Sequence, residues 1–300
     1  MTRQEKRAFG DLRHRDRKQR LQKLLAAKSR PQTTENLDTP ALVIGVGPGV
    51  CTVSIDGDTR LVRCEIPVAP GDEVSVRHEK VTAIAPRRTA LSRTDPANPH
   101  RERTIAANID LLLIVAAIAE PPFRPGLVDR YLIAAARGGV QPILCLNKID
   151  LGGEAAIEYI GHLPVVRCST RTGEGIEQLR GLLAGSLAVL AGHSGVGKSS
   201  ILNALADAEQ SREGRGTGLH TTSASRLYEL RNGARIIDTP GIREFGLGPV
   251  TLAELRSAFP EFTSERCRFR DCSHREEPDC AVRRENGPRY RSYLRLVGEM

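Results

Sequence analysis

Hydrophobic and polar positions follow two different rhythms along the chain. Residues 41 to about 93 hold short runs rich in β-branched residues, such as VCTVSI and DEVSV, broken by turn residues. From about residue 104, apolar runs such as DLLLIVAAIA and LAVLAG alternate with stretches whose apolar residues recur at helical spacing. The first rhythm predicts a small all-β barrel, and the second predicts an α/β unit with a parallel sheet covered by helices on both faces.

Turn signals and composition divide the chain further. Asp56-Gly57 lies between alternating runs and predicts a tight hairpin, and a barrel of this size is most often an OB-fold. The barrel segment holds no aromatic residue for stacking bases, so the pattern indicates a fold more than an RNA-binding role. Thr251 and Glu254 form a capping box before a helical run. We expect a basic arm and linker at 1–39, an OB-fold barrel at 40–93, an α/β domain at 94–250 and a small helical, metal-binding domain at 251–300.

The net charge of +8 comes entirely from the arm. Residues 1–30 carry eleven Lys and Arg and three Asp and Glu, whereas the rest of the chain carries 33 Lys and Arg and 33 Asp and Glu. A separable basic arm is attracted to nucleic-acid phosphates, although a solvated amphipathic helix is the alternative. The longest apolar run, 109–119, is too short to span a bilayer, and no secretory signal is recognisable, so we expect a cytoplasmic protein without membrane contact.

GHSGVGKSS follows an apolar strand and leads into a helical run, which is the context of a phosphate-binding loop. Its glycines let backbone N–H groups face phosphate oxygens, while Lys198 reaches the β- and γ-phosphates and Ser199 binds Mg²⁺. The nucleotide-binding residues expected here are Gly192, His193, Ser194, Gly195, Val196, Gly197, Lys198, Ser199 and Ser200.

Two further motifs complete a GTP site. DTPG supplies Asp238 for Mg²⁺ and the Gly241 backbone for the γ-phosphate, and Thr221 or Thr222 in the preceding loop offers Mg²⁺ a hydroxyl. NKID supplies Asp150, whose carboxylate accepts from the N1–H and amino group of guanine, which adenine cannot match.

Other residues around NKID support the base. Asn147 and Lys148 would brace the loop and lie along the purine, and the strand end at Ser169 and Thr170 would contact guanine O6. The base motif precedes the phosphate loop, which is a rotated order for a GTPase. Circular permutation preserves every strand neighbour when the original termini are close, so the site can survive the rotation.

The C-terminal region contains a candidate metal site. Cys267, Cys272, His274 and Cys280 follow the spacing C-x4-C-x-H-x5-C, which suits a closed tetrahedral Zn²⁺ site with a structural role. Seven cysteines in a chain without a secretory signal argue for thiols or metal ligands rather than a disulfide framework. Cys51, Cys64, Cys145 and Cys168 lie in apolar runs and are expected in the core.

Together, VDRYLIAA, LNKIDL, GHSGVGKSSILN, LHTTSASRLYEL, IDTPGIREF and the cysteine spacing followed by RYRSY resemble the ribosome small subunit-dependent GTPase A family. The resemblance covers roughly residues 40 to 300. It implies an OB barrel, a circularly permuted GTPase domain and a zinc domain. It also implies a GTP hydrolase that assists late maturation of the 30S subunit, binds 16S rRNA in its GTP state and leaves after subunit-stimulated hydrolysis. We expect a monomer with GTP or GDP, Mg²⁺ and one Zn²⁺.

The resemblance also bears on the chemistry. Ile242 follows Gly241 where many GTPases place a water-orienting glutamine, and the family is thought to use a switch-loop histidine, which here matches His220. His220 and Lys198 are therefore the expected catalytic residues. The barrel lacks a basic loop before Gly71-Asp72 that relatives would have, a loss for which the basic arm would compensate. The alternative hypothesis is a nucleotide-gated RNA-binding module that acts on another ribosomal or RNA target.

Overall fold

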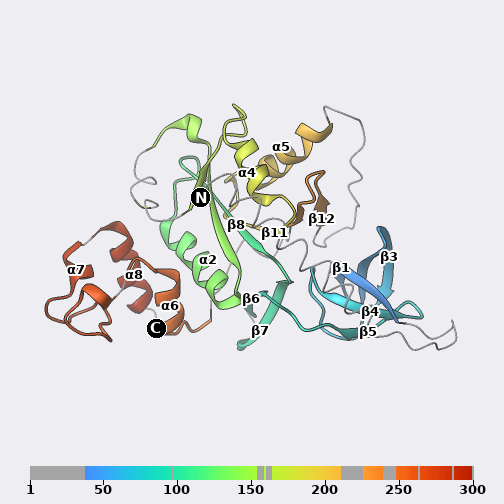
Figure 1. Ribbon diagram of the computed structural model, residues 1–300, viewed down its shortest axis with the longest axis horizontal. Helices are drawn as coiled ribbons and strands as arrows, with labels where there is room; N and C mark the ends of the chain where they lie inside the picture. Colours follow the sequence, from blue (N-terminus) through green and yellow to red (C-terminus); the bar gives the residue numbers. More distant parts are fainter. Residues whose placement is uncertain are drawn as a thin grey trace.

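The computed structural model describes residues 38–95, 98–153, 159, 164–210, 226–238, 248–262, 264–285 and 287–298. Residues 1–37 of the expected arm, together with His220, Thr221, Thr222 and Gly241, lie outside the described residues. A β-barrel, a central sheet with its helices and a C-terminal group of short helices follow one another across the molecule (Figure 1). No helix in the described part of the chain is both long and apolar enough to cross a membrane.

The N-terminal strands close into a barrel in the order β1-β2-β3-β5-β4, which confirms the predicted all-β unit. Asp56 and Gly57 both have positive φ, 51° and 93°, so they form the tight turn that their sequence predicts. The inward side chains are small and branched, including Val43, Val53 and Val62. The barrel strands are β1 (Thr39–Gly47), β2 (Val50–Ile55), β3 (Asp58–Arg63), β4 (Glu73–Arg77) and β5 (Lys80–Ile84).

A turn at Gly71 and Asp72 fastens the barrel to the next part of the chain. Gly71 has a φ of +92°, and a Cβ atom there would lie 1.9 Å from the Ala107 carbonyl oxygen, so only glycine fits. The buried Asp72 carboxylate accepts two hydrogen bonds from Arg87, at 2.7 and 2.8 Å. Arg87 also donates to Thr104 in a hairpin formed by β6 (Ala90–Asp95) and β7 (Asn98–Ala107). The contacts on both sides of the turn therefore fix the barrel against the hairpin.

The central sheet has the order β10-β9-β8-β11-β13-β12, and only β12 runs antiparallel to its neighbour. Its strands are β8 (Leu111–Ala117), β9 (Gln141–Asn147), β10 (Val165–Arg167), β11 (Leu187–Ala191), β12 (Arg226–Glu229) and β13 (Arg235–Asp238). The helices around it are α2 (Pro125–Gly138), α4 (Ile176–Leu183) and α5 (Lys198–Gln210).

The two faces of the sheet build two different cores. Along β8, Leu112 and Ile114 pack into the core that contains α2, whereas Leu113 and Val115 pack into the core that contains α4 and α5. All seven residues of β8 are buried because helices cover both faces, which confirms the predicted parallel sheet. Alternate residues of one strand therefore join helices that are far apart in the sequence.

The C-terminal unit contains α6 (Leu252–Ala258), the short 3-10 turn η3 (Ser264–Arg266), α7 (Ala281–Glu285) and α8 (Pro288–Gly298). Another 3-10 turn, η1 (Ile149–Leu151), follows β9 in the central domain. Thr251 and Glu254 form the predicted capping box at the start of α6. Arg137, in the last turn of α2, donates from Nε to Glu254 at 2.6 Å. This hydrogen bond holds the pKa of Glu254 at about 2, well below its ordinary value.

A buried ionic cluster joins α8 to the central domain. Arg289 donates to Asp129 of α2 at 2.7 Å and to Glu261 at 2.6 Å, and the Asp129 side chain is 0% exposed. The hydroxyl groups of Ser292 and Tyr159 also donate to Asp129. Burial raises the pKa of Asp129, whereas Arg289 and the two hydroxyl groups act in the opposite direction. The cluster therefore attaches the C-terminal unit to α2 through a buried carboxylate whose hydrogen bonds offset the cost of its burial.

Replacing Asp129 with alanine should lower the free energy of unfolding by about 3 kcal/mol or more, because Arg289 would remain buried without its partner. Urea denaturation of the purified variant measures the loss. Glu65→Ala is the control, since the Glu65–Lys80 pair is exposed on the barrel and its removal should change stability little. Equal stability of the Asp129→Ala variant and the wild type would contradict the role assigned to the cluster.

Candidate GTP and metal sites

The base motif and the phosphate loop meet at the carboxyl ends of β9 and β11. Asn147, the last residue of β9, is fully buried and donates from Nδ2 to the Val196 carbonyl at 3.0 Å. A Cβ atom on Gly197 would lie 2.3 Å from the same Nδ2 atom, so glycine is required there. Two motifs almost fifty residues apart are thus held together by one side chain.

Asp150 lies in the turn η1, three residues after Asn147. Its two carboxylate oxygens have different hydrogen-bond partners. Ser169 donates to Oδ1 at 2.5 Å, and the Arg171 guanidinium donates to Oδ2 at 2.7 Å. The hydrogen bond from Ser169 lowers the pKa of Asp150, and Arg171 lowers it further. A carboxylate held ionised in this way accepts hydrogen bonds and cannot donate one.

The remaining residues of the base site lie around Asp150. Lys148 has a φ of +63°, and its ammonium group donates to the Glu120 carbonyl in the turn after β8. Ser169 is buried, and the neighbouring Thr170 is half-buried. Arg171 was not among the residues expected at the site. The sequence around Arg171 gives no signal for that role, because the contact with Asp150 depends on how β9 and β10 lie side by side.

The phosphate loop curls tightly between β11 and α5. Gly192 has a φ of +144°, and a Cβ atom there would lie 2.2 Å from the Val115 carbonyl oxygen on β8. The Lys198 ammonium group donates to the carbonyls of Gly192 and His193, at 2.7 and 2.8 Å. His193 Nδ1 lies 2.7 Å from the Ser194 carbonyl oxygen. The lysine therefore points back across the loop, where phosphate oxygens would sit.

The candidate Mg²⁺ ligands lie on two neighbouring elements. Ser199 and Ser200 are exposed in the first turn of α5, and Ser194 and Gly195 are exposed within the loop. Asp238 ends β13, whose residue Ile237 pairs with Val189 of the parallel strand β11, so Asp238 lies at the same end of the sheet as the phosphate loop. The other expected contributors, Thr221, Thr222, His220 and Gly241, fall beyond the described residues.

Helix α2 also reaches the phosphate loop, a contact that sequence reasoning missed. Tyr131 is buried to 1% exposure on this helix, and burial raises the pKa of its hydroxyl to about 12 although a hydrogen bond with the Gly192 backbone opposes the shift. Tyr131, Val128 and Gly192 line a small hollow beside the loop. Since Asp129 of the same helix holds Arg289, α2 contacts both the phosphate loop and the C-terminal unit.

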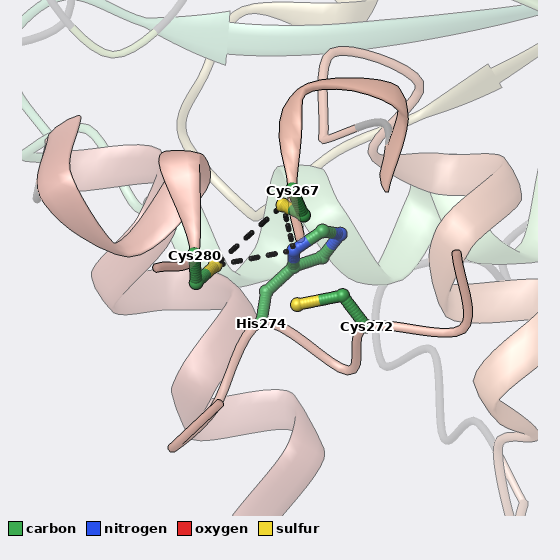
Figure 2. A group of neighbouring side chains, drawn as sticks. All are labelled: Cys267, Cys272, His274 and Cys280. Atoms are coloured by element: carbon green, nitrogen blue, oxygen red, sulfur yellow. Dashed lines mark hydrogen bonds between the residues drawn. The ribbon is translucent and has the colours of Figure 1, made fainter. Parts of the chain in front are cut away.

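The four expected metal ligands converge on one point in the C-terminal unit (Figure 2). Their ligand atoms all lie within 4.8 Å of one another. His274 Nδ1 lies 3.6 Å from the Cys267 sulfur and 3.5 Å from the Cys280 sulfur, and these two sulfurs are 3.9 Å apart. Such separations match the roughly 3.5 to 3.8 Å expected between ligands around one tetrahedral ion with zinc's bond lengths.

The surroundings of the cluster also suit a metal. His274 Nε2 lies 3.1 Å from the Phe262 carbonyl oxygen, an arrangement that places the proton on Nε2 and leaves Nδ1 free to bind an ion. Burial lowers the pKa of His274, which favours its neutral form. Burial raises the pKa of the Cys267 thiol, but hydrogen bonds with the Ala281 and Val282 backbone and with the other two cysteines together outweigh it and lower the pKa overall. The donor set therefore fits one closed four-ligand site.

Comparisons with known proteins agree with this architecture. The family described as RsgA GTPase matches residues 84–248. The chain belongs to the RsgA GTPase family. Membership makes it a GTP hydrolase with a circularly permuted GTPase domain, as its motif order predicts.

Individual members of the RsgA family are similar over most of the chain. A protein of Photorhabdus laumondii named small ribosomal subunit biogenesis GTPase RsgA is 38% identical over 244 residues, which are 73% of this chain and 69% of the relative. The protein of that name from Pseudomonas putida is 40% identical over 255 residues, which are 76% of this chain and 74% of the relative.

Two solved structures have a similar fold. YjeQ from Thermotoga maritima is 27% identical, covers 88% of this chain and 98% of its own, and gives a TM-score of 0.68. YloQ, described as a circularly permuted GTPase, is 24% identical, covers 90% of this chain and 97% of its own, and gives a TM-score of 0.64, which supports the fold alone.

Replacing Asp150 with asparagine should exchange base specificity. The amide can donate to the C2 carbonyl of xanthine but cannot accept both donors of guanine, so affinity for GDP should fall at least about 100-fold while affinity for xanthosine diphosphate rises. Titration of both nucleotides by isothermal calorimetry measures the change. Asp58→Asn on the barrel is the matched control, and it should leave both affinities as in the wild type.

The metal cluster should hold one divalent ion per chain, measured by elemental mass spectrometry. Removing the ion with a chelator should make the C-terminal unit sensitive to limited proteolysis, because ligand contacts with the ion replace a larger apolar core. Cys272→Ala should lose most of the metal. Cys51→Ala, which removes a buried barrel thiol outside the cluster, should keep it; full metal content in both variants would exclude the site.

Proposed function

We propose that the chain hydrolyses GTP during maturation of the small ribosomal subunit, docking on the subunit with GTP bound and leaving after hydrolysis. The observation that carries the proposal is the hydrogen bond from Asn147 to Val196, which joins a guanine-reading loop to a phosphate loop. The names of the relatives, small ribosomal subunit biogenesis GTPase RsgA, support the subunit as partner. Both the 16S rRNA contact and action as a monomer in the cytoplasm belong to the same proposal.

Guanine would be recognised by the Asp150 carboxylate. Its low pKa keeps it ionised, so its oxygens accept from guanine N1–H and the amino group, while Ser169 fixes the orientation of the carboxylate. Asn147 and Lys148 would hold the loop and lie along the purine. Ser169 and Thr170 would offer their backbone to guanine O6. Adenine presents no donor at N1 and would leave the carboxylate unpaired.

The phosphates would lie over the loop from Gly192 to Ser200. Its backbone N–H groups and the positive end of α5 favour negative charge, and Lys198 would exchange the loop carbonyls for β- and γ-phosphate oxygens. Mg²⁺ would be held by Ser199, Asp238 and either Thr221 or Thr222. The ion neutralises charge on the phosphates, and Gly241 would offer its N–H to the γ-phosphate.

Hydrolysis needs a group that orients the attacking water. Ile242 cannot do so, and we assign this role to His220, which directly precedes Thr221. A site without the glutamine should turn over slowly by itself. Subunit binding would then accelerate hydrolysis by placing His220.

The cluster of Cys267, Cys272, His274 and Cys280 would hold one Zn²⁺ ion. Three thiolates and an imidazole fill all four tetrahedral positions, so the ion would have a structural role and no room for a reacting water. Because Asp129 and Arg137 attach the C-terminal unit to α2, the zinc-bearing unit would present a rigid surface to the subunit.

GTP hydrolysis and subunit binding should be measured side by side for the wild type and His220→Ala. In pelleting assays with a nonhydrolysable GTP analogue, both proteins should bind 30S subunits more tightly than with GDP. Purified 30S subunits should accelerate hydrolysis by the wild type but not by the variant, since only the water-orienting group is missing. Binding to 50S subunits in place of 30S would overturn the partner, and stimulated hydrolysis by His220→Ala would overturn the assignment of His220.

A further inference from the structure

All seven cysteines of the chain lie near other cysteines. Three belong to the metal cluster, and Cys51 lies beside Cys64 in the barrel, where burial and the neighbouring thiol raise the pKa of Cys51 to about 12. The remaining two, Cys145 and Cys168, are both 0% exposed, and their sulfurs are 3.1 Å apart. This pair belongs to the domain of the central sheet, and the proposed GTP hydrolysis does not use either thiol.

Cys145 and Cys168 lie directly beneath the guanine site. Cys145 precedes Asn147 by two residues on β9, and Cys168 immediately precedes Ser169 after β10. The Cys168 sulfur is 3.7 Å from Asn147 Oδ1, and the Cys168 carbonyl accepts from the N–H of Ile149 at 3.3 Å. The two thiols are thus attached to both strands that carry the base-reading residues.

The chemistry of the two thiols is unequal. A hydrogen bond from Cys145 lowers the pKa of Cys168, whereas the contact with Cys168 and burial raise the pKa of Cys145 well above its ordinary range. Cys168 is therefore the better nucleophile, whereas Cys145 is the thiol that keeps its proton. Access requires only local opening, because β10 is a three-residue strand at the edge of the sheet and hydrogen peroxide is a small molecule.

We propose that Cys145 and Cys168 form a peroxide-sensitive dithiol, whose oxidation to a disulfide weakens guanine nucleotide binding. The Cys168 thiolate attacks one oxygen of hydrogen peroxide, so an S–O bond forms, the O–O bond breaks and hydroxide leaves. The Cys145 sulfur then attacks the Cys168 sulfur, so an S–S bond forms and the S–O bond breaks. The oxygen released from Cys168 leaves as water with the Cys145 proton, and the earlier hydroxide takes up the proton that the Cys168 thiol had lost. The two thiols lose two electrons and two protons, and one peroxide becomes two waters.

The disulfide would distort the base site because its geometry differs from that of the resting thiols. An S–S bond is about 2.05 Å long, so the sulfurs must approach by about 1 Å from their present 3.1 Å. β10 has only three paired residues to resist that movement. Its displacement would carry Ser169 away from Asp150, and a shift of this size can cost a site about 100-fold in activity. This consequence rests on the proposed guanine site, whereas disulfide formation does not.

The test compares wild-type protein before and after treatment with hydrogen peroxide. Peptide mass mapping without reduction should find Cys145 joined to Cys168, and affinity for a fluorescent GDP analogue should fall at least tenfold and return with dithiothreitol. Absence of this disulfide, or a disulfide with unchanged GDP affinity, would overturn the proposal. Failure of the reduced protein to bind GDP would instead remove the proposed guanine site, while the mapping would still decide whether the disulfide forms.

Two variants separate this pair from the other thiols under the same peroxide treatment. Cys145→Ala should retain GDP affinity, although the metal-cluster thiols remain oxidisable. Cys51→Ala is the matched control, since it also removes a buried strand thiol beside another cysteine, and it should lose affinity as the wild type does. Loss of affinity in oxidised Cys145→Ala would overturn the proposal; if that variant fails to fold, the reversible wild-type change and the mapped disulfide decide it.

Discussion

The parallel pairing of β11 with β8 is the constraint on which the nucleotide site depends. Ala188 to Ala191 of β11 pair with Leu111 to Ile114 of β8, and β8 in turn pairs with β9 up to Asn147. Because all three strands run in one direction, the loops after β9 and β11 emerge at the same edge. Asn147 can then reach Val196, whichever loop comes first in the chain. The rotated motif order therefore leaves the geometry of the site intact.

Local patterns were sufficient to predict most of the fold. β-branched runs with the Asp56-Gly57 turn predicted the barrel, continuous apolar runs predicted the buried parallel strands, and the Thr251 capping box predicted the start of α6. The convergence of the four Cys and His side chains could also be predicted, because they lie within fourteen residues and the chain need only fold locally to bring them together. In each case the decisive signal was contained in one short segment.

Contacts between distant segments could not be predicted in the same way. In the sequence, nothing distinguishes Arg171 from other polar residues, because its contact with Asp150 forms only when β9 and β10 lie side by side. Cys145 and Cys168 were expected in the core, but the sequence did not predict that they contact each other. Asp129 and Arg289 are 160 residues apart, and the sequence around either residue does not indicate that the two form an ion pair. Such pairings depend on the order of the strands and on how the helices pack. A single sequence does not show which distant segments will come into contact.

The position of β8 at the centre of the sheet has a consequence for synthesis of the chain. β9 follows β8 closely, but β11 begins seventy residues after β8 ends. At ordinary translation speeds of about 5 to 20 residues per second, this interval lasts about 4 to 14 s. During that time one side of an entirely apolar strand has no partner, and an unpaired strand edge invites association with other chains. The permuted order of the chain thus leaves this edge of β8 open while the protein is still being synthesised.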